Sequence, residues 1–195
     1  MPRLMFQRPR RIEWEELNPR FGRMAAEPFE KGYALTVGNS LRRVLLSVIP
    51  GAAVVWAKLD KVSADGTRVT GMQEDVTTLL LNLKKLVVRL QDDKPATARL
   101  DVKGPKTVTA ADLAEAGLEV LNPETPLAVV DAGGRLGLEV GVRTGRGYVS
   151  AAGHTEPVPD GAIALDAAFS PIQRVNYTVE MSRLGKITDY EKLVL

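Results

Sequence analysis

The residues that could carry out chemistry are few and widely spaced along this chain. The only histidine, His154, shares a segment with Glu156 and Asp160, so a metal site there would have one imidazole and two carboxylates as ligands. The stretch TGRGY at residues 144–148 lacks the Lys-Ser or Lys-Thr pair of a phosphate-binding loop, and its flanks have a strand pattern. We interpret the first segment as a surface loop and the second as a turn.

Other catalytic arrangements are missing from the sequence. There is no cysteine, which excludes disulfides, thiolate metal ligands and cysteine nucleophiles. No GxSxG motif marks a serine nucleophile, and no two carboxylates stand together on an apolar background as a general acid and base would. We therefore expect no active site within this chain, and neither a cofactor nor a metal.

Two adjacent arginines, Arg42 and Arg43, raise a different question, because they lie within an amphipathic segment at residues 32–51. Four apolar side chains recur there at helical spacing: Leu41, Val44, Leu45 and Val48. Pro50 and Gly51 end the pattern. Burial of an unpaired charge is costly. The arginines therefore either lie at the rim of the helix with their heads in water or contact a partner protein, and helical geometry leaves both interpretations open.

The composition of the 195 residues is that of a globular protein. Apolar residues make up 45% of the chain, enough for one or two packed cores. Charged residues nearly cancel and leave a formal net charge of +2, so charge alone does not indicate nucleic-acid binding. The basic N-terminus lacks the apolar core of a signal peptide, and no run of about 18 apolar residues indicates a membrane span. We expect a soluble, cytoplasmic protein.

The pattern along the chain predicts many strands and a few helices, which is an α+β class. Strand patterns are found at residues 22–37, 51–62, 86–91, 97–104, 127–130, 135–142, 172–183 and 191–195. Besides residues 32–51, helical patterns occupy residues 73–86 and a short segment that begins at the N-cap Thr109 and ends at Gly117. We expect residues 86–91 and 97–104 to form a hairpin. In the last alternating segment, one face carries four side chains: Val175, Tyr177, Val179 and Met181.

Residues 18–54, NPRFGRMAAEPFEKGYALTVGNSLRRVLLSVIPGAAV, resemble the signature of the N-terminal domain of the bacterial DNA-directed RNA polymerase alpha subunit. Further matches to that family follow in order over nearly the whole chain: QEDVTTLLLNLKKLVVRL, GPKTVTAADL, LEVLNP, GRGYV, LDAAFSPIQRVNYTVE and SRLGKITDYEKL. The resemblance implies an α+β fold in two parts. Residues 1–50 and 172–195 would form a dimerisation subdomain of sheet and helices, and residues 51–171 would form an inserted, mostly β subdomain.

The resemblance also implies a function in assembly rather than catalysis. In the family two alpha chains form a homodimer, one chain binds the beta subunit and the other binds beta-prime. The catalytic magnesium lies elsewhere in the enzyme, and DNA is reached only through the assembled complex. The chain would thus be a subunit of a nucleotidyltransferase without an active site of its own.

Family roles carry over to specific positions of this sequence. Arg43 matches the second arginine of the LRR motif, which is associated with holding the beta subunit, and Lys84 matches the lysine of NLK, with a similar role. Ser170, Pro171 and Arg174 fall in the SPVxRV segment of the polymerase contact surface. The helix would supply the dimer contact through five residues: Leu41, Arg42, Leu45, Leu46 and Ile49.

Three departures from the family pattern limit the resemblance. Residues 63–72 read SADGTRVTGM where the family usually has LHEFSTIPGV, so one polymerase contact is not carried over. Val48 stands where a second serine is usual. The sequence stops at Leu195, before the long helix that completes the dimer subdomain in the family, and from this we expect a weak, concentration-dependent dimer.

Two alternatives from other classes stay open at this point. One is a free-standing nucleic-acid-binding protein that uses the basic N-terminal arm, and the other is a small-molecule enzyme centred on the loop from Ser150 to Gly161. The balanced charge of the chain weighs against the first, because phosphate binding needs a surplus of cations.

Overall fold

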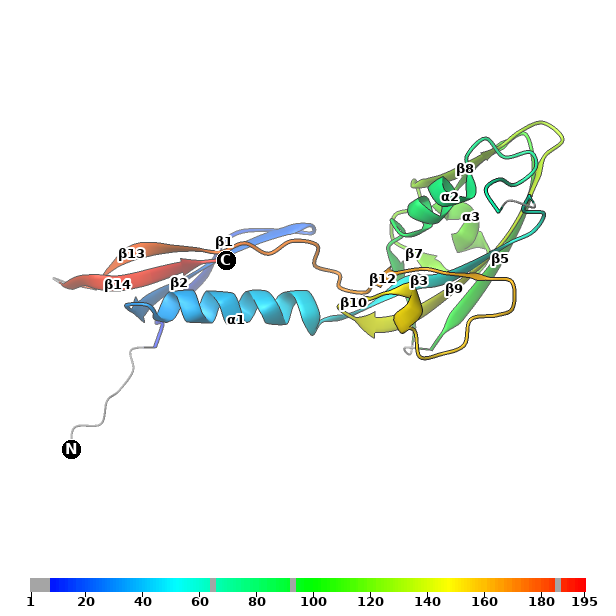
Figure 1. Cartoon of the computed structure of the whole chain (residues 1–195). Helices are drawn as coiled ribbons and strands as arrows, with labels where there is room; N and C mark the ends of the chain where they lie inside the picture. The colour runs from blue at the N-terminus through cyan, green and yellow to red at the C-terminus, as the bar shows by residue number, and fades with distance from the viewer. Residues whose placement is uncertain (1–7, 64–65, 92–93, 185–186) are drawn as a thin grey trace. The chain divides into compact units, whose positions relative to one another are not determined.

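A computed structural model describes residues 8–63, 66–91, 94–184 and 187–195. It divides into two compact units: unit 1 comprises residues 1–48 and 172–195, and unit 2 comprises residues 49–171. Both combine antiparallel strands with helical structure, which confirms the predicted α+β class (Figure 1). Within the described ranges no helix is both long and apolar enough to cross a membrane.

Unit 1 is a four-stranded antiparallel sheet, in the order β1-β2-β14-β13, with one helix packed on it (Figure 1). Its elements are β1 (Arg11–Asn18), β2 (Phe21–Glu30), α1 (Tyr33–Ser47), β13 (Thr178–Leu184) and β14 (Ile187–Val194). β2 includes Pro28, and β1 was not predicted. Every residue of β1 is exposed.

The core of unit 1 is small. Its buried residues are Ala26 and Phe29 of β2, Ala34 of α1 and Leu193 of β14. Three half-buried side chains pack against them: Val37, Leu41 and Tyr177. The helix therefore faces the sheet with the stripe that begins at Ala34.

The prediction that Val44 and Val48 lie on the core stripe of α1 is wrong. Their side chains are 49% and 48% exposed. The part of α1 that packs on the sheet comprises Ala34, Val37 and Leu41, and Val48 is the C-cap residue at the end of the helix. At 100° per residue, Val44 lies about 60° to one side of Leu41, on the flank of the helix.

The first turn of α1 is held by a residue from the other end of the sequence. The carboxylate of Glu191 in β14 accepts hydrogen bonds from the N–H groups of Gly32 at 2.8 Å and Ala34 at 3.2 Å. It thereby satisfies two of the donors that a helix start leaves open, and its charge suits the positive end of the helix dipole.

Unit 2 is built on a larger antiparallel sheet in the order β5-β9-β3-β4-β7, with β11 added to β3. Its strands are β3 (Pro50–Leu59), β4 (Val88–Arg89), β5 (Ala96–Lys103), β7 (Glu119–Val120), β9 (Arg135–Arg146) and β11 (Ile163–Ala164). Two strand pairs stand beside it: β6 (Lys106–Thr109) with β8 (Pro126–Val130), and β10 (Tyr148–Val149) with β12 (Ala167–Ala168). The helices are α2 (Val76–Leu83), α3 (Ala110–Glu115) and the 3-10 turn η1 (Ala151–Gly153).

Both helices predicted in this region are confirmed. α2 buries Val76, Leu79 and Leu83 at helical spacing, and the side chain of Asp75 caps it by accepting from the N–H of Thr78 at 2.7 Å. α3 begins in a capping box, in which the Thr109 and Asp112 side chains each accept from the other's backbone N–H. The chain leaves α3 at Gly117, whose φ of +102° suits glycine.

The predicted hairpin between residues 86–91 and 97–104 is wrong. β4 pairs with β3 and β7, and β5 pairs along its whole length with β9. The twelve-residue β9 is long enough to pair with all eight residues of β5, whereas β4 is only two residues long. Asp92 and Asp93 of the predicted turn lie outside the described residues.

The alternating segment at residues 172–183 forms a strand only from Thr178 onward. Val175 is buried ahead of the strand, while Met181 is 81% exposed. β13 is the edge strand of the unit 1 sheet. The predicted single apolar face is therefore only partly realised.

The two faces of the unit 2 sheet bury different clusters. Leu136, Leu138 and Val140 of β9 face a large core shared with α2 and α3. A bulge in β3 next to Val55 turns both Val55 and Trp56 to the other face, where they join Ala167 and Phe169. On that face β9 carries glycines. A side chain at Gly141 would overlap the indole of Trp56, and one at Gly145 would come within 2.6 Å of the Phe169 ring.

Candidate partner-binding surfaces

The two arginines of α1 are exposed in the isolated chain. No ion pair among the described residues involves either Arg42 or Arg43. Arg43 follows the buried Ala34 by nine residues, which at 100° per residue places it on the side of the helix opposite the sheet. Both heads therefore lie in water and are available to a partner.

Apolar side chains lie on both flanks of the same helix. Tyr33 and Val44 share one flank, and Leu35 with Leu46 share the other, next to Arg42. Leu35 is 56% exposed, a contact candidate that sequence analysis missed, although its spacing of seven residues to Arg42 could have revealed it. An arginine beside exposed and half-buried apolar residues is a composition typical of protein interfaces.

The predicted dimer residues do not all lie on this free surface. Leu41 packs against the core of unit 1, and Leu45 is half-buried along the same stripe. Arg42 is exposed and Leu46 half-buried. Ile49 follows the C-cap of α1 and belongs to unit 2.

The five predicted polymerase-contact residues are divided between the units. Arg43 and Arg174 belong to unit 1, and both are exposed. Lys84, Ser170 and Pro171 belong to unit 2, where Pro171 is exposed and Ser170 half-buried.

Lys84, at the C-cap of α2, forms an ion pair within the chain. Its ammonium lies 3.1 Å from Oδ2 of Asp166, and the other carboxylate oxygen of Asp166 accepts from the N–H of Ala151 at 3.0 Å. The Ala151 N–H and the Lys84 ammonium together hold the pKa of Asp166 below its ordinary value. Sequence reasoning did not find Asp166, because it is 82 positions from Lys84.

The segment that ends at Ser170 and Pro171 is attached to the sheet at several points. The N–H of Leu165 donates to Val55 O, Ala167 pairs with Val149, and the N–H of Phe169 donates to Gly147 O at 2.8 Å. The side chain of Phe169 is buried against Gly145. The backbone just before Ser170 is thus fixed by β3, β10 and β9.

The loop with the only histidine braces this segment instead of gathering ligands. His154 Nε2 donates to the carbonyl oxygen of Leu165 at 2.8 Å, and Glu156 pairs with Arg143 of β9 at 3.0 Å. Within the described ranges no group of three or more His, Asp or Glu side chains is placed to hold a metal ion.

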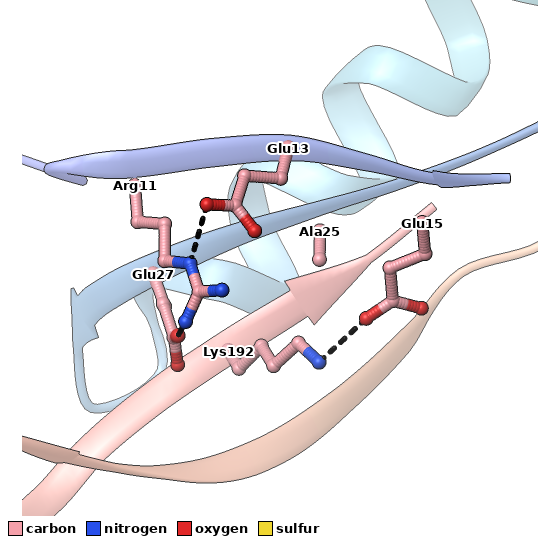
Figure 2. A pocket seen from close by; sticks show the side chains of 6 residues that line it. All are labelled: Arg11, Glu13, Glu15, Ala25, Glu27 and Lys192. Atoms are coloured by element: carbon pink, nitrogen blue, oxygen red, sulfur yellow. Dashed lines mark hydrogen bonds and ion pairs between the residues drawn. The ribbon is translucent and has the colours of Figure 1, made fainter. Parts of the chain in front are cut away.

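A shallow hollow on the unit 1 sheet is lined by charged side chains (Figure 2). Its lining is Arg11, Glu13, Glu15, Ala25, Glu27 and Lys192, and its volume is about 70 Å³. A hydrogen bond from Arg11 lowers the pKa of Glu13, and a hydrogen bond from Lys192 lowers the pKa of Glu15. Sites for small molecules measure about 300 Å³ or more. This hollow is therefore an internally paired charge cluster rather than a ligand site.

β1 adds exposed apolar side chains that sequence analysis also missed. Ile12, Trp14 and Leu17 are each at least 60% exposed, and Phe21 at the start of β2 is 51% exposed. The alternation at the start of RIEWEELN could have indicated Ile12 and Trp14, since Glu13 separates them and glutamates follow. Unit 1 thus exposes apolar surface on both its helix and its first strand.

Comparison with known proteins identifies the family. Residues 58–170, more than half of the chain, match the family model for the RNA polymerase Rpb3/RpoA insert domain. The chain belongs to this family. The matched residues all lie within unit 2 of this Rpb3/RpoA-type chain.

Curated relatives extend the likeness to both units. The chain is 46% identical over 194 residues to the DNA-directed RNA polymerase subunit alpha of Moorella thermoacetica, an alignment that covers 98% of this chain and 62% of that relative. It is 48% identical over 177 residues to the corresponding subunit of Symbiobacterium thermophilum, covering 90% of this chain and 56% of that relative. The predicted resemblance to bacterial RNA polymerase alpha subunits is confirmed. The chain spans about three fifths of the length of these relatives.

Proposed function

We propose that this chain is a non-catalytic assembly subunit of bacterial DNA-directed RNA polymerase, which forms a homodimer and binds the beta and beta-prime subunits. The observation that carries the proposal is the free face of α1, where Arg42 and Arg43 lie exposed beside apolar side chains. The curated relatives, which bear the name of the alpha subunit, support the choice of complex. A role in transcription implies a cytoplasmic location, and DNA would be reached only through the assembled enzyme.

The chemistry of α1 suits a partner that supplies both acidic and apolar groups. An exposed guanidinium loses little by staying in water, but it gains two directed hydrogen bonds when a carboxylate meets it in a closed interface. The apolar flanks would exclude water around such a pair, and water exclusion strengthens it. Arg43 is our choice for the beta contact, because it points directly away from the sheet.

The dimer contact is proposed for the flank that carries Leu35, Arg42 and Leu46. These residues lie along one line of the helix, at spacings of seven and four, so two copies could pack against each other along it. The exposed side chains of β1 would enlarge the covered area towards that of a stable interface.

The beta contact is tested by co-purification of Arg43→Ala with the beta subunit. We expect the variant to fold as the wild type does but to lose most of the recovered beta subunit, because loss of one partner of a buried charge pair costs about 2–5 kcal/mol. Arg20→Ala is the matched control, since Arg20 is an exposed arginine outside α1. Equal recovery of beta with both variants would reject Arg43 as the contact.

The dimer contact is tested by sedimentation over a hundredfold dilution. Leu46→Glu should shift the chain to monomer, because it sets two like charges against each other across a twofold axis. Leu121→Glu is the control, since Leu121 is exposed in unit 2. If Leu46→Glu left the dimer unchanged, the self-association would use another surface.

A further inference from the structure

The pairing of Lys84 with Asp166 suggests a role for Lys84 that differs from a direct contact. The side chain of Lys84 is only 34% exposed, and its ammonium lies 3.1 Å from the Asp166 carboxylate. Because the pair has no net charge, a partner surface above it needs no acidic group opposite Lys84. The Lys84 ammonium instead matters because it holds Asp166, and the chain around Asp166, in place.

What it holds is the segment that leads to Ser170 and Pro171. The backbone bonds of that segment go to Val55 of β3, to Val149 of β10 and to the turn at Gly147. The carboxylate of Asp166 adds two further attachments, one to α2 through Lys84 and one to η1 through the N–H of Ala151. Asp166 thus joins the end of a helix, a 3-10 turn and a strand in one place.

We propose that Asp166 is a positioning residue, through which Lys84 fixes the segment that presents Ser170 and Pro171 to the beta or beta-prime subunit. The inference rests on the proposed function above and assigns a task to a residue that the sequence resemblance did not single out. Asp166 lies four residues before Ser170. Release of Asp166 from α2 would let the segment shift relative to Lys84, and a partner would have to pay the entropy of ordering it again.

A double-mutant cycle on the full chain, with the purified beta and beta-prime subunits as probes, tests the proposal. Asp166→Asn keeps an oxygen that can accept from Ala151 but removes the charge, and Lys84→Met keeps the aliphatic stem but removes the ammonium. We expect each variant to weaken binding of the same subunit by a similar factor of about three or more, and the double variant to bind no more weakly than either single variant. Lys84→Arg, unlike Lys84→Met, should retain binding, because a guanidinium also reaches the carboxylate of Asp166.

A direct contact through Lys84 predicts a different outcome. Asp166→Asn would then bind as the wild type does or more tightly, since it frees the ammonium for the partner, and that result would overturn the proposal. Losses that multiply in the double variant would overturn it as well. Melting midpoints measured in parallel separate these effects from general unfolding.

Failure of this inference can be told apart from failure of the proposed function. If the wild-type chain bound neither subunit, the proposed function would be rejected together with the inference. If Arg43→Ala abolished binding of beta while Asp166→Asn changed binding of neither subunit, the inference alone would be rejected.

Discussion

Units 1 and 2 bury their apolar side chains in different ways. Unit 2 has a sheet with a buried cluster on each face, closed on one side by α2 and α3 and on the other by the segment around Phe169. The described part of unit 1 has a core cluster of four buried residues, under a single helix. It also leaves Ile12, Trp14 and Leu35 more than half exposed.

The difference indicates where stability comes from in each unit. A large enclosed core supports a fold by itself, whereas a small one leaves a narrow margin between burial and conformational entropy. We therefore expect unit 2 to be stable alone and unit 1 to gain stability from whatever covers its exposed apolar side chains, since a partner that binds only the folded state stabilises it.

The largest expected effect is that of Leu193→Ala. Leu193 is fully buried in the small core of unit 1, and loss of such a side chain costs about 2–5 kcal/mol. We expect hydrogen exchange to show lost protection in α1, β2 and β14, while β3 and β9 stay protected. Leu136→Ala, at a fully buried position in unit 2, is the counterpart, and there protection should be retained in both units. Equal loss of protection in the two variants would break the comparison.

Next in size is Gly141→Ala in unit 2. Its methyl group would overlap the indole of Trp56, and overpacking of this kind costs about 1–3 kcal/mol. The midpoint of chemical denaturation measures the loss. Gly153→Ala is the control, because a methyl group there would stay 3.3 Å from its nearest neighbour, the end of the Ser150 side chain. A tolerated Gly141→Ala would mean that the indole can move and that this face is loosely packed.

A smaller, pH-dependent loss is expected from Asp112→Asn. Burial alone would raise the pKa of Asp112, but hydrogen bonds from Lys106 and from the N–H of Thr109 outweigh it and leave the pKa lowered. The ionised carboxylate therefore stabilises the fold above its unfolded pKa of about 3.9, and this contribution is lost as the pH falls through the lower folded value.

Thermal melts across a pH series measure this contribution. At neutral pH we expect Asp112→Asn to cost about 0.5–2 kcal/mol, the range for a helix cap, and the difference from the wild type should shrink below about pH 4. A difference that stayed constant down to pH 2 would show that packing, rather than charge, explains the loss.

The smallest effect is expected at the charged hollow of unit 1. Lys192→Met removes the cation that pairs with Glu15 at 2.7 Å, but such surface pairs contribute little and are screened by salt. Melts in low and high salt should differ from the wild type only in low salt. A large loss in both would mean that this hollow, rather than Leu193, carries the stability of unit 1.

The helices of unit 2 were predictable because their signals are local. The apolar period of α2, its Asp75 cap and the Thr109 capping box all lie within a few residues of the turns they stabilise. Strand pairing was not predictable in the same way. β14 pairs with β2 across most of the chain length, and no short-range signal specifies such a partner.

The candidate surfaces likewise combine local features that the sequence shows with long-range contacts that it does not. The type and spacing of Arg42 and Arg43 were readable from the sequence, but whether their heads lie in water depends on which stripe of α1 meets the sheet. That choice is made by Ala34 and by Leu193, which is 159 residues further along. The pairing of Lys84 with Asp166 is likewise set by tertiary structure.

The cap of α1 by Glu191 also affects the order in which the parts of the chain can fold during synthesis. A ribosome makes α1 and β2 early, yet the strand that pairs with β2 and the carboxylate that caps α1 are among the last residues of this sequence to emerge. Unit 2 is complete at residue 171 and can fold before β14 has emerged from the ribosome. During that interval the apolar stripe of α1 has only β1 and β2 to pack on, without Leu193, so the nascent chain is exposed to aggregation and to chaperones until β14 emerges.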